Sequence, residues 1–154
     1  MSYIELDEVD STNDYVKRNL NKLPNLSVVR CNYQTNGRGR NGHVWQSKNG
    51  DDLLMSILVK DFKKPQDLQK MTQLVAFSVA GLLDRYGIKA KIKWPNDIYV
   101  DDLKICGILV EAIYQTDLEG VVVGVGLNVN SINGDYASMK MKTGQTYQVK
   151  SLMI

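Results

Sequence analysis

Residues 98–113 read IYVDDLKICGILVEAI, and residues 120–129 read GVVVGVGLNV. Val, Ile and Leu dominate both stretches, as is typical of strands, and the Asp101–Asp102 pair between apolar runs is typical of a hairpin turn. We therefore expect three strands here: Ile98–Val100, Lys104–Ile113 and Gly120–Val129. Strands that follow one another along the chain favour a mainly antiparallel or mixed sheet.

The first part of the chain alternates strand and helix patterns. Short apolar or β-branched runs predict further strands at Tyr3–Leu6, Leu26–Cys31, Leu53–Val59 and Lys91–Lys93. A capping box that begins at Ser11 predicts a helix from about Thr12 to Asn21. Pro65, an apolar stripe at helical spacing and Gly87 predict a second helix. We expect an α+β fold, with a mixed, mainly antiparallel sheet and the helices on one face.

Length and composition exclude several classes of protein. The 154 residues suit one domain, spanning 1–154. The apolar residues at 149, 152, 153 and 154 predict the start of an amphipathic helix, so we expect that the C-terminal part of the domain is truncated. A net charge of +2 argues against a general nucleic-acid binder. No apolar run reaches the ~18–20 residues that span a bilayer, and the acidic N-terminus is no signal peptide, so we expect a cytoplasmic protein without a membrane partner. Cys31 and Cys106 have no metal-binding spacing, and no zinc or calcium motif is present.

One long segment is too polar and too rich in glycine to pack as a helix. Residues 34–50 read QTNGRGRNGHVWQSKNG, with four glycines, three cations and no acid. Glycines let backbone N–H groups approach a ligand, and arginines offer forked donors to phosphate or carboxylate. Trp45 can stack on a planar ring. A solvated, flexible surface loop is the alternative. The segment lacks the Gly-Lys-Ser/Thr of a Walker A loop, and its strand–loop–strand context disfavours a dinucleotide site.

Other polar positions have a functional and a structural interpretation. Asn96 and Asp97 follow Pro95 and can bind a polar ligand or form an Asx turn. Lys104 begins an apolar strand, where it aims inward at an anion or is an edge charge. Ser11 caps a helix whose first N–H groups can also serve a ligand.

The glycines at 124 and 126 interrupt a strongly strand-forming run. Glycine weakens a strand unless something must approach the backbone closely, and a bulge is the alternative. His43 is the single histidine and has no nucleophile in a readable triad, which disfavours His-based nucleophilic catalysis.

Four stretches, taken in order, resemble the catalytic domain of biotin protein ligases. They are DSTND at 10–14, QTNGRGRNGHVW at 34–45, KWPNDIYVDDLKICGILVE at 93–111 and VVVGVGLNVN at 121–130. The resemblance covers nearly the whole chain, and the shared order makes it specific. It implies a fold of the class II aminoacyl-tRNA synthetase and biotin ligase type. It also implies an enzyme that makes biotinyl-5′-AMP from biotin and ATP and transfers biotin to a lysine of a biotin carboxyl carrier protein.

The resemblance assigns roles to single residues. The biotin-binding set would be Ser11, Thr12, Gln34, Gly37, Arg38, Gly124 and Gly126. The ATP- or adenylate-binding set would be Arg40, Trp45, Asn96, Asp97 and Asn128. Lys104 would bridge the biotin carboxylate and the α-phosphate, and Lys104 and Arg40 would be the catalytic pair.

These roles agree with the chemistry of the reaction. Attack of a carboxylate on an α-phosphate brings two anions together, and two cations with Mg²⁺ on the phosphates offset that repulsion. The protein need supply neither a nucleophile nor a metal ligand. The loop at 34–50 is expected to order over the ligand and to exclude water.

Departures and alternatives follow from the same comparison. Asn41 and His43 stand where the family commonly has arginines, which removes cations from the phosphate side. A lipoate–protein ligase is one alternative, although the chain has no RRxSGGG-type loop and Gln34 favours biotin. A domain that binds biotin or a carrier without turnover is another. Pairing of two copies through an exposed sheet is also implied.

The roles of Lys104 and Ser11 make separable predictions. Lys104→Ala should largely abolish adenylate formation, because the repulsion between the two acids is then uncompensated. Ser11→Ala should mainly weaken biotin binding. Pyrophosphate release and calorimetry with biotin measure the two effects, and equal adenylate formation by the wild type and Lys104→Ala would contradict the role of Lys104.

Overall fold

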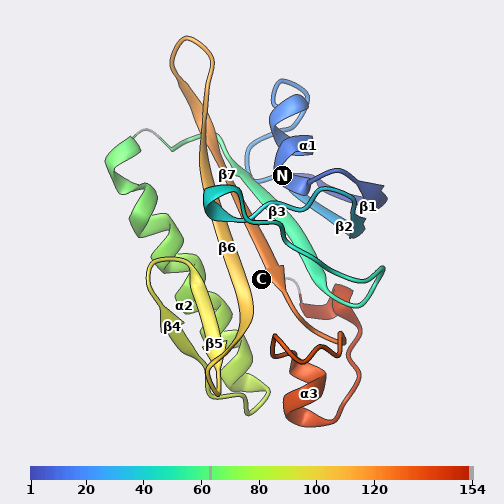
Figure 1. Ribbon diagram of the computed structural model, residues 1–154. Coiled ribbons are helices and arrows are strands. Elements are labelled where there is room, and N and C mark those ends of the chain that lie inside the picture. Colours follow the sequence, from blue (N-terminus) through green and yellow to red (C-terminus); the bar gives the residue numbers. More distant parts are fainter. Residues whose placement is uncertain (63, 153–154) are drawn as a thin grey trace.

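A seven-stranded sheet forms the centre of the computed structural model, which describes residues 1–62 and 64–152 (Figure 1). In sheet order the strands are β1 (Tyr3–Val9), β2 (Val28–Gln34), β3 (Leu53–Val59), β7 (Leu118–Leu127), β6 (Leu103–Tyr114), β5 (Asp97–Val100) and β4 (Lys91–Lys93). Only the β1–β2 pair is parallel among these strands. The predicted α+β class and mainly antiparallel sheet are confirmed.

The strands predicted late in the chain pair as expected. Asp101 and Asp102 have φ values of 48° and 63°, the left-handed pair that a two-residue hairpin turn requires. Strand β7 begins and ends two residues before its predicted bounds. The Asn128 N–H still donates to the Ile105 carbonyl of β6, but the Val129 N–H turns away from the sheet and donates to the buried carboxylate of Asp52 at 2.9 Å.

Strand β2 begins later than predicted, at Val28 rather than Leu26. Leu26 has a φ of 61°, which is incompatible with an extended strand. The hydroxyl of Ser27 donates to the carbonyl of Pro24, so these residues form a turn before the strand. A positive φ at leucine has no signal in the sequence, and the predicted boundary was therefore too early.

Two helices follow from the caps seen in the sequence. Helix α1 (Thr12–Arg18) is capped by Ser11, whose Oγ accepts from the Asp14 N–H at 3.5 Å, and it ends before the predicted Asn21. Helix α2 (Leu68–Arg85) is followed by Gly87 at a φ of 75°. The short α3 (Met139–Thr143) was not predicted. Single 3₁₀ turns occupy Arg40–Gly42, Pro65–Asp67 and Val149–Leu152.

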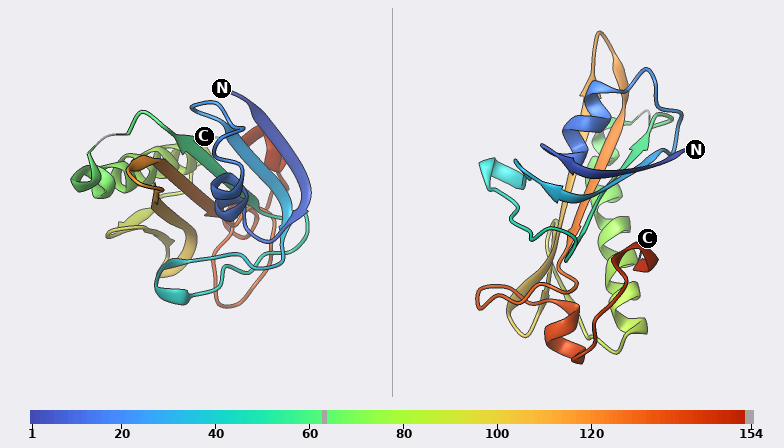
Figure 2. Two further views of the ribbon diagram at one scale, coloured as in Figure 1. Left: turned by 90° about the horizontal axis from the view of Figure 1, so that it is seen from above. Right: turned by 90° about the vertical axis from the view of Figure 1, so that its right-hand side faces the viewer.

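The prediction that the helices share one face of the sheet is wrong. Val16 of α1 packs with Leu58 and Val122 on one face, whereas Leu83 of α2 packs with Val125 on the other. Figure 2 shows α1 and α2 on opposite sides of the sheet. Strands β3 and β7 bury nearly every side chain, so both of their faces need a cover, and each helix provides one.

The C-terminal segment belongs to the core on the α2 side. Met139, Val149 and Leu152 are buried in the same cluster as Leu83. The predicted start of an amphipathic helix at 149–154 is a 3₁₀ turn as far as Leu152, and Met153 and Ile154 lie outside the described residues. Within the described chain, each helix is too short or too polar to cross a membrane.

Two leucines of α2 provide a matched test of this packing. Leu83 is fully buried and Leu74 is 62% exposed on the same helix. Leu83→Ala should lower the free energy of unfolding by about 2–5 kcal/mol, because it leaves a cavity in the core. Leu74→Ala should change it by less than about 0.5 kcal/mol. Urea denaturation measures both, and comparable losses would contradict the placement of α2.

Candidate functional site

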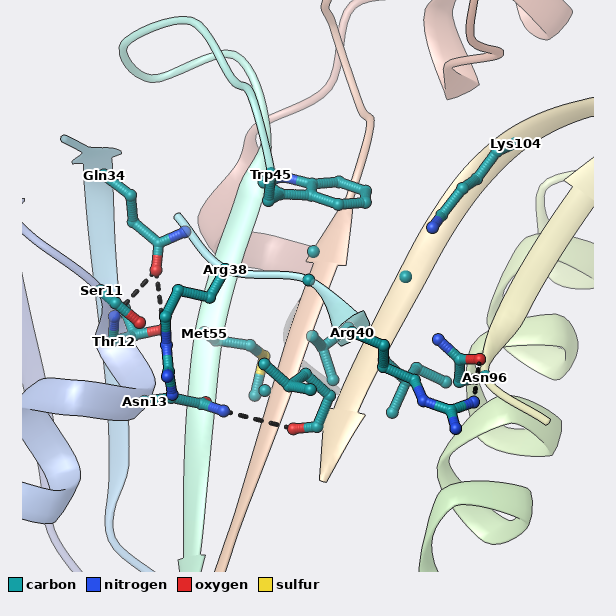
Figure 3. Close-up of a pocket in the computed structure, with 17 residues that line it drawn as sticks. Ser11, Thr12, Asn13, Gln34, Arg38, Arg40, Trp45, Met55, Asn96 and Lys104 are labelled. Carbon is teal, nitrogen blue, oxygen red and sulfur yellow. Dashed lines mark hydrogen bonds between the residues drawn. The ribbon is translucent and has the colours of Figure 1, made fainter. Parts of the chain in front are cut away.

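A cavity opens on the α1 side of the sheet, between α1, strands β6 and β7, and a loop that we call the lid (residues 37–45) (Figure 3). Most of the predicted site residues line it: Ser11, Thr12, Gln34, Arg38, Arg40, Trp45, Asn96, Lys104, Gly124 and Gly126. We call it the first cavity. Residues that are far apart in the chain therefore come together as the resemblance implied.

One end of the first cavity is a hydrogen-bonded polar cluster. The N–H and Oγ of Thr12 lie 2.8 and 3.1 Å from Gln34 Oε1 and donate to it. The hydroxyl of Ser56 lies 2.7 Å from Thr12 Oγ1 and 2.6 Å from Asn13 Oδ1. Asn13 and Ser56 were missed as functional residues, although Asn13 lies within the DSTND motif. This end offers donors and acceptors to a polar, uncharged group.

The glycines of β6 and β7 make room for side chains above the sheet. A Cβ on Gly124 would lie 2.5 Å from Asn13 Oδ1, and a Cβ on Gly126 would lie 2.5 Å from Cε2 of Trp45. Gly107 of β6 pairs with Gly126 and also faces the indole. The ladder continues through all three positions, so the alternative of a bulge at Gly124 and Gly126 is wrong. Close approach to the backbone explains these glycines.

The opposite wall carries a connected set of polar side chains. The ammonium of Lys104 lies 2.7 Å from Asp97 Oδ1, and it sits 5.6 Å from the centre of the Trp45 ring. The amide of Asn96 donates to the same Asp97 oxygen at 3.1 Å and accepts from Arg40 Nη1 at 2.8 Å. Lys104 therefore points inward and is not an edge charge. In the described chain Arg40 forms no ion pair, and its partner is neutral.

Arg38 takes part in a closed set of four ion pairs, which we call the charged ring (Asp14, Lys17, Arg38 and Glu111). Arg38 Nη2 lies 2.7 Å from Glu111 and 3.1 Å from Asp14, and Lys17 Nζ lies 2.8 Å from Glu111 and 3.8 Å from Asp14. Burial tends to raise the pKa of Glu111. Hydrogen bonds from Lys17 and Asn13, with the charges of Lys17 and Arg38, outweigh burial and lower that pKa.

Sequence reasoning missed Glu111 as a site residue. Its only signal was its position at the end of the 93–111 motif. Its importance depends on the register of β6 against β7, which brings it beside α1 and the lid.

A second cavity lies on the far side of Trp45 and Lys104, which line both cavities. Its other residues are His43, Val44, Gln46, Asp97, Tyr99, Asn128 and Tyr136. Asn128 was predicted to face a nucleotide. It lines this cavity, but its amide also donates to the Ala137 carbonyl at 3.0 Å and so holds the segment before α3. Aromatic rings beside polar groups suit a planar heterocyclic ligand.

Gly37 does not line either cavity. It is the first residue of the lid, where a Cβ would meet the Trp45 carbonyl oxygen at 2.5 Å and the Gln34 amide at 2.9 Å. The Trp45 N–H donates to the Gly37 carbonyl at 2.9 Å. Gly37 thus allows the two ends of the lid to pack closely.

In the lid and at Ser47, just after it, buried polar atoms lack partners in the described structure. Among the described residues, Arg38 Nε, Trp45 Nε1 and Ser47 Oγ are buried and have no hydrogen-bond partner. An unsatisfied buried donor costs about 1–3 kcal/mol, so a ligand that supplies acceptors here would be stabilised. Nowhere in the residues described do three or more His, Cys, Asp or Glu side chains gather to hold a metal ion.

Comparisons with known proteins identify the family of the chain. Residues 5–128 match the model of the biotin/lipoate A/B protein ligase family. The chain is 36% identical to the bifunctional ligase/repressor BirA of Bacillus subtilis over 118 residues, which are 75% of this chain and 36% of BirA. It is 39% identical to the chloroplastic biotin–protein ligase 1 of Arabidopsis thaliana over 128 residues, covering 80% of this chain and 35% of that protein.

A solved structure extends the comparison to the fold. The biotin protein ligase of Aquifex aeolicus, in complex with biotin and ATP, superposes with a TM-score of 0.82 at 30% identity, covering 98% of this chain and 65% of that one. The LipL1 structure of P. falciparum with lipoate has a TM-score of 0.62 at 10% identity and shares the fold alone. The chain spans about a third of the length of the curated relatives it matches.

Gly126→Ala tests the packing of Trp45. The added Cβ would displace the indole, so we expect a red-shifted emission from Trp45 and a loss of about 1–3 kcal/mol in the free energy of unfolding. A Trp94→Phe background isolates the Trp45 signal. Gly134→Ala is the control, because nothing lies within 4 Å of its Cβ. An unshifted spectrum for Gly126→Ala would contradict the close contact.

Proposed function

The chain belongs to the biotin/lipoate A/B protein ligase family, and we propose on this basis that it joins biotin and ATP as biotinyl-5′-AMP. Biotin then passes to a lysine of a biotin carboxyl carrier protein. The observation that carries the proposal is the position of Lys104, where the first and second cavities meet beside Trp45. A two-part site with an inward cation at the junction suits a reaction that joins two anions.

The first cavity suits biotin. A ureido ring has two N–H donors and one carbonyl acceptor, and the cluster of Thr12, Asn13 and Gln34 offers the complementary groups. The dithiolane ring of lipoate has no such donors, so it would form no hydrogen bonds of this kind with the cluster. The polar end of the cavity therefore favours biotin over lipoate.

The second cavity suits the nucleotide. Trp45, Tyr99 and Tyr136 provide aromatic surfaces for a purine, and Asn128 lies among them. Biotin in the first cavity and ATP in the second would direct the biotin carboxylate and the α-phosphate toward Lys104. Mg²⁺ would enter bound to the ATP phosphates.

The chemistry needs only charge compensation from the protein. A carboxylate oxygen of biotin attacks the α-phosphorus, the bond to the β-phosphate oxygen breaks, and pyrophosphate leaves with the electron pair. Two unit charges at 4 Å repel by about 4 kcal/mol at an effective dielectric constant of 20. Lys104 and Arg40 offset this repulsion, and a substrate carboxylate competes with Asp97 for the Lys104 ammonium.

The transfer step uses the stored mixed anhydride. The amine of the carrier lysine, in its neutral form, attacks the carbonyl carbon, the bond to the phosphate oxygen breaks, and AMP leaves. The amide forms as the nitrogen gives up a proton to solvent. The lid protects the anhydride from water until the carrier arrives. A biotin carboxyl carrier protein as the acceptor, pairing of two copies and a cytoplasmic location stay predictions.

Pyrophosphate release with biotin and Mg·ATP, followed by labelling of a carrier domain, tests the function. The wild type should release pyrophosphate with biotin and not with lipoate. Gln34→Met should raise the KM for biotin roughly tenfold or more, because Thr12 loses its acceptor, while kcat changes little. If calorimetry detects heat of biotin binding but no pyrophosphate is released, the ligase proposal is contradicted and the chain is a binding domain. If calorimetry detects binding of lipoate and not of biotin, the chain is a lipoate ligase.

A further inference from the structure

We propose that Glu111 is a positioning residue that holds the lid and the polar end of the biotin cavity in one arrangement, an inference that rests on the proposed function. Glu111 lines neither cavity, and it has no part in the mechanism above. Its carboxylate nevertheless contacts two residues that do line the first cavity, Asn13 and Arg38.

The charged ring joins three separate elements. Helix α1 supplies Asp14 and Lys17, the lid supplies Arg38, and strand β6 supplies Glu111. Glu111 occupies a fixed place, since it pairs with Val122 in the ladder between β6 and β7. The strand therefore acts as the rigid support to which the helix and the lid are both fastened.

A single carboxylate oxygen links the lid to the polar cluster. Glu111 Oε2 accepts from Asn13 Nδ2 at 2.8 Å and from Arg38 Nη2 at 2.7 Å. Because Asn13 donates its amide N–H to Glu111, its amide oxygen faces Ser56 and the cavity wall. Loss of the carboxylate would free the Asn13 amide to turn and would release Arg38 at the same time.

The anchoring of Arg38 extends along the lid to Trp45. Arg38 forms a bridge with Val44, and the Trp45 N–H donates to the Gly37 carbonyl, so the two ends of the lid are tied together. A lid fastened at Arg38 therefore keeps Trp45 in place over Gly126. The wall between the two cavities depends on a carboxylate that lies outside both of them.

The ring also separates the roles of the two lid arginines. It contains two carboxylates and two cations, so the charge of Arg38 is compensated. Within residues 1–62 and 64–152, the Arg40 guanidinium has only the neutral Asn96 as partner, and it keeps its charge for the substrate phosphates. Because Glu111 pairs with Arg38, Arg38 holds the lid, and Arg40 stays available to bind the substrate.

Glu111→Gln tests this role, with Glu119→Gln as the matched control. Glu119 is an exposed residue of β7. Two measurements are made: the dissociation rate of biotin by stopped flow, and the rate of trypsin cleavage after Arg40 in ligand-free protein, followed by mass spectrometry. Glu111→Gln should release biotin roughly 5–30 times faster and be cleaved at least about five times faster, because a charge-assisted hydrogen bond is lost. Glu119→Gln should stay within about twofold of the wild type in both.

A double-mutant cycle shows whether Glu111 acts through Arg38. Arg38→Gln should also speed cleavage after Arg40, and Glu111→Gln combined with Arg38→Gln should add nothing further. If Glu111→Gln alone folds poorly, faster cleavage of Arg38→Gln by itself still tests the tie between Arg38 and Glu111, because this variant leaves Glu111 paired with Lys17.

Two results overturn the proposal. One is that Glu111→Gln matches the wild type in both rates, and the other is that the two substitutions multiply in the cleavage rate. Failure of the wild type to bind biotin would instead refute the proposed function, and the cleavage rates would still decide whether Glu111 holds the lid.

Discussion

The direct pairing of Gly107 with Gly126 decides where the site lies on the sheet. Two glycines opposite one another leave a strip of bare backbone, and the Trp45 indole fills it. The indole in turn divides the hollow surface into two cavities, with Lys104 at their junction. Gly124 makes the same allowance for Asn13. Side chains at these positions would move Trp45 and Asn13 outward, and the proposed separation of biotin from nucleotide would be lost with them.

The cations of the site differ in whether their nearest partner carries a negative charge, and this difference suits the proposed chemistry. Lys17, Arg38 and Lys104 each face a carboxylate, whereas Arg40 faces an amide. A cluster of bare cations in a partly buried site would repel one another and destabilise the fold. Carboxylate partners remove that cost while the site is empty. An anionic substrate can then compete for Lys104, and at Arg40 it has to displace only the neutral amide of Asn96 among the residues that the structure describes.

Most of the fold was predictable because its local signals agree. The Asp101–Asp102 turn, the Ser11 cap and Gly87 each marked a boundary, and Leu53–Val59 was predicted with its observed bounds. Strand β2 was misplaced because the positive φ of Leu26 leaves no trace in the sequence. The helices were assigned to one face because burial on both sides of β3 depends on tertiary packing. In the site, motif residues were found by pattern. Glu111 and Ser56 were missed because only strand register brings them to the site.

The pairing of β3 with β7 has a consequence for how the protein is made. Val59 lies beside Val121 and Leu53 beside Leu127, so the two strands come from distant parts of the chain. The polar cluster takes Ser56 from one strand, and the floor takes Gly124 and Gly126 from the other. Contacts between segments so far apart form slowly, since a long loop must close first. A nascent chain on the ribosome therefore has no complete first cavity until Leu127 has emerged, and binding of the proposed ligand would report that synthesis has passed this point.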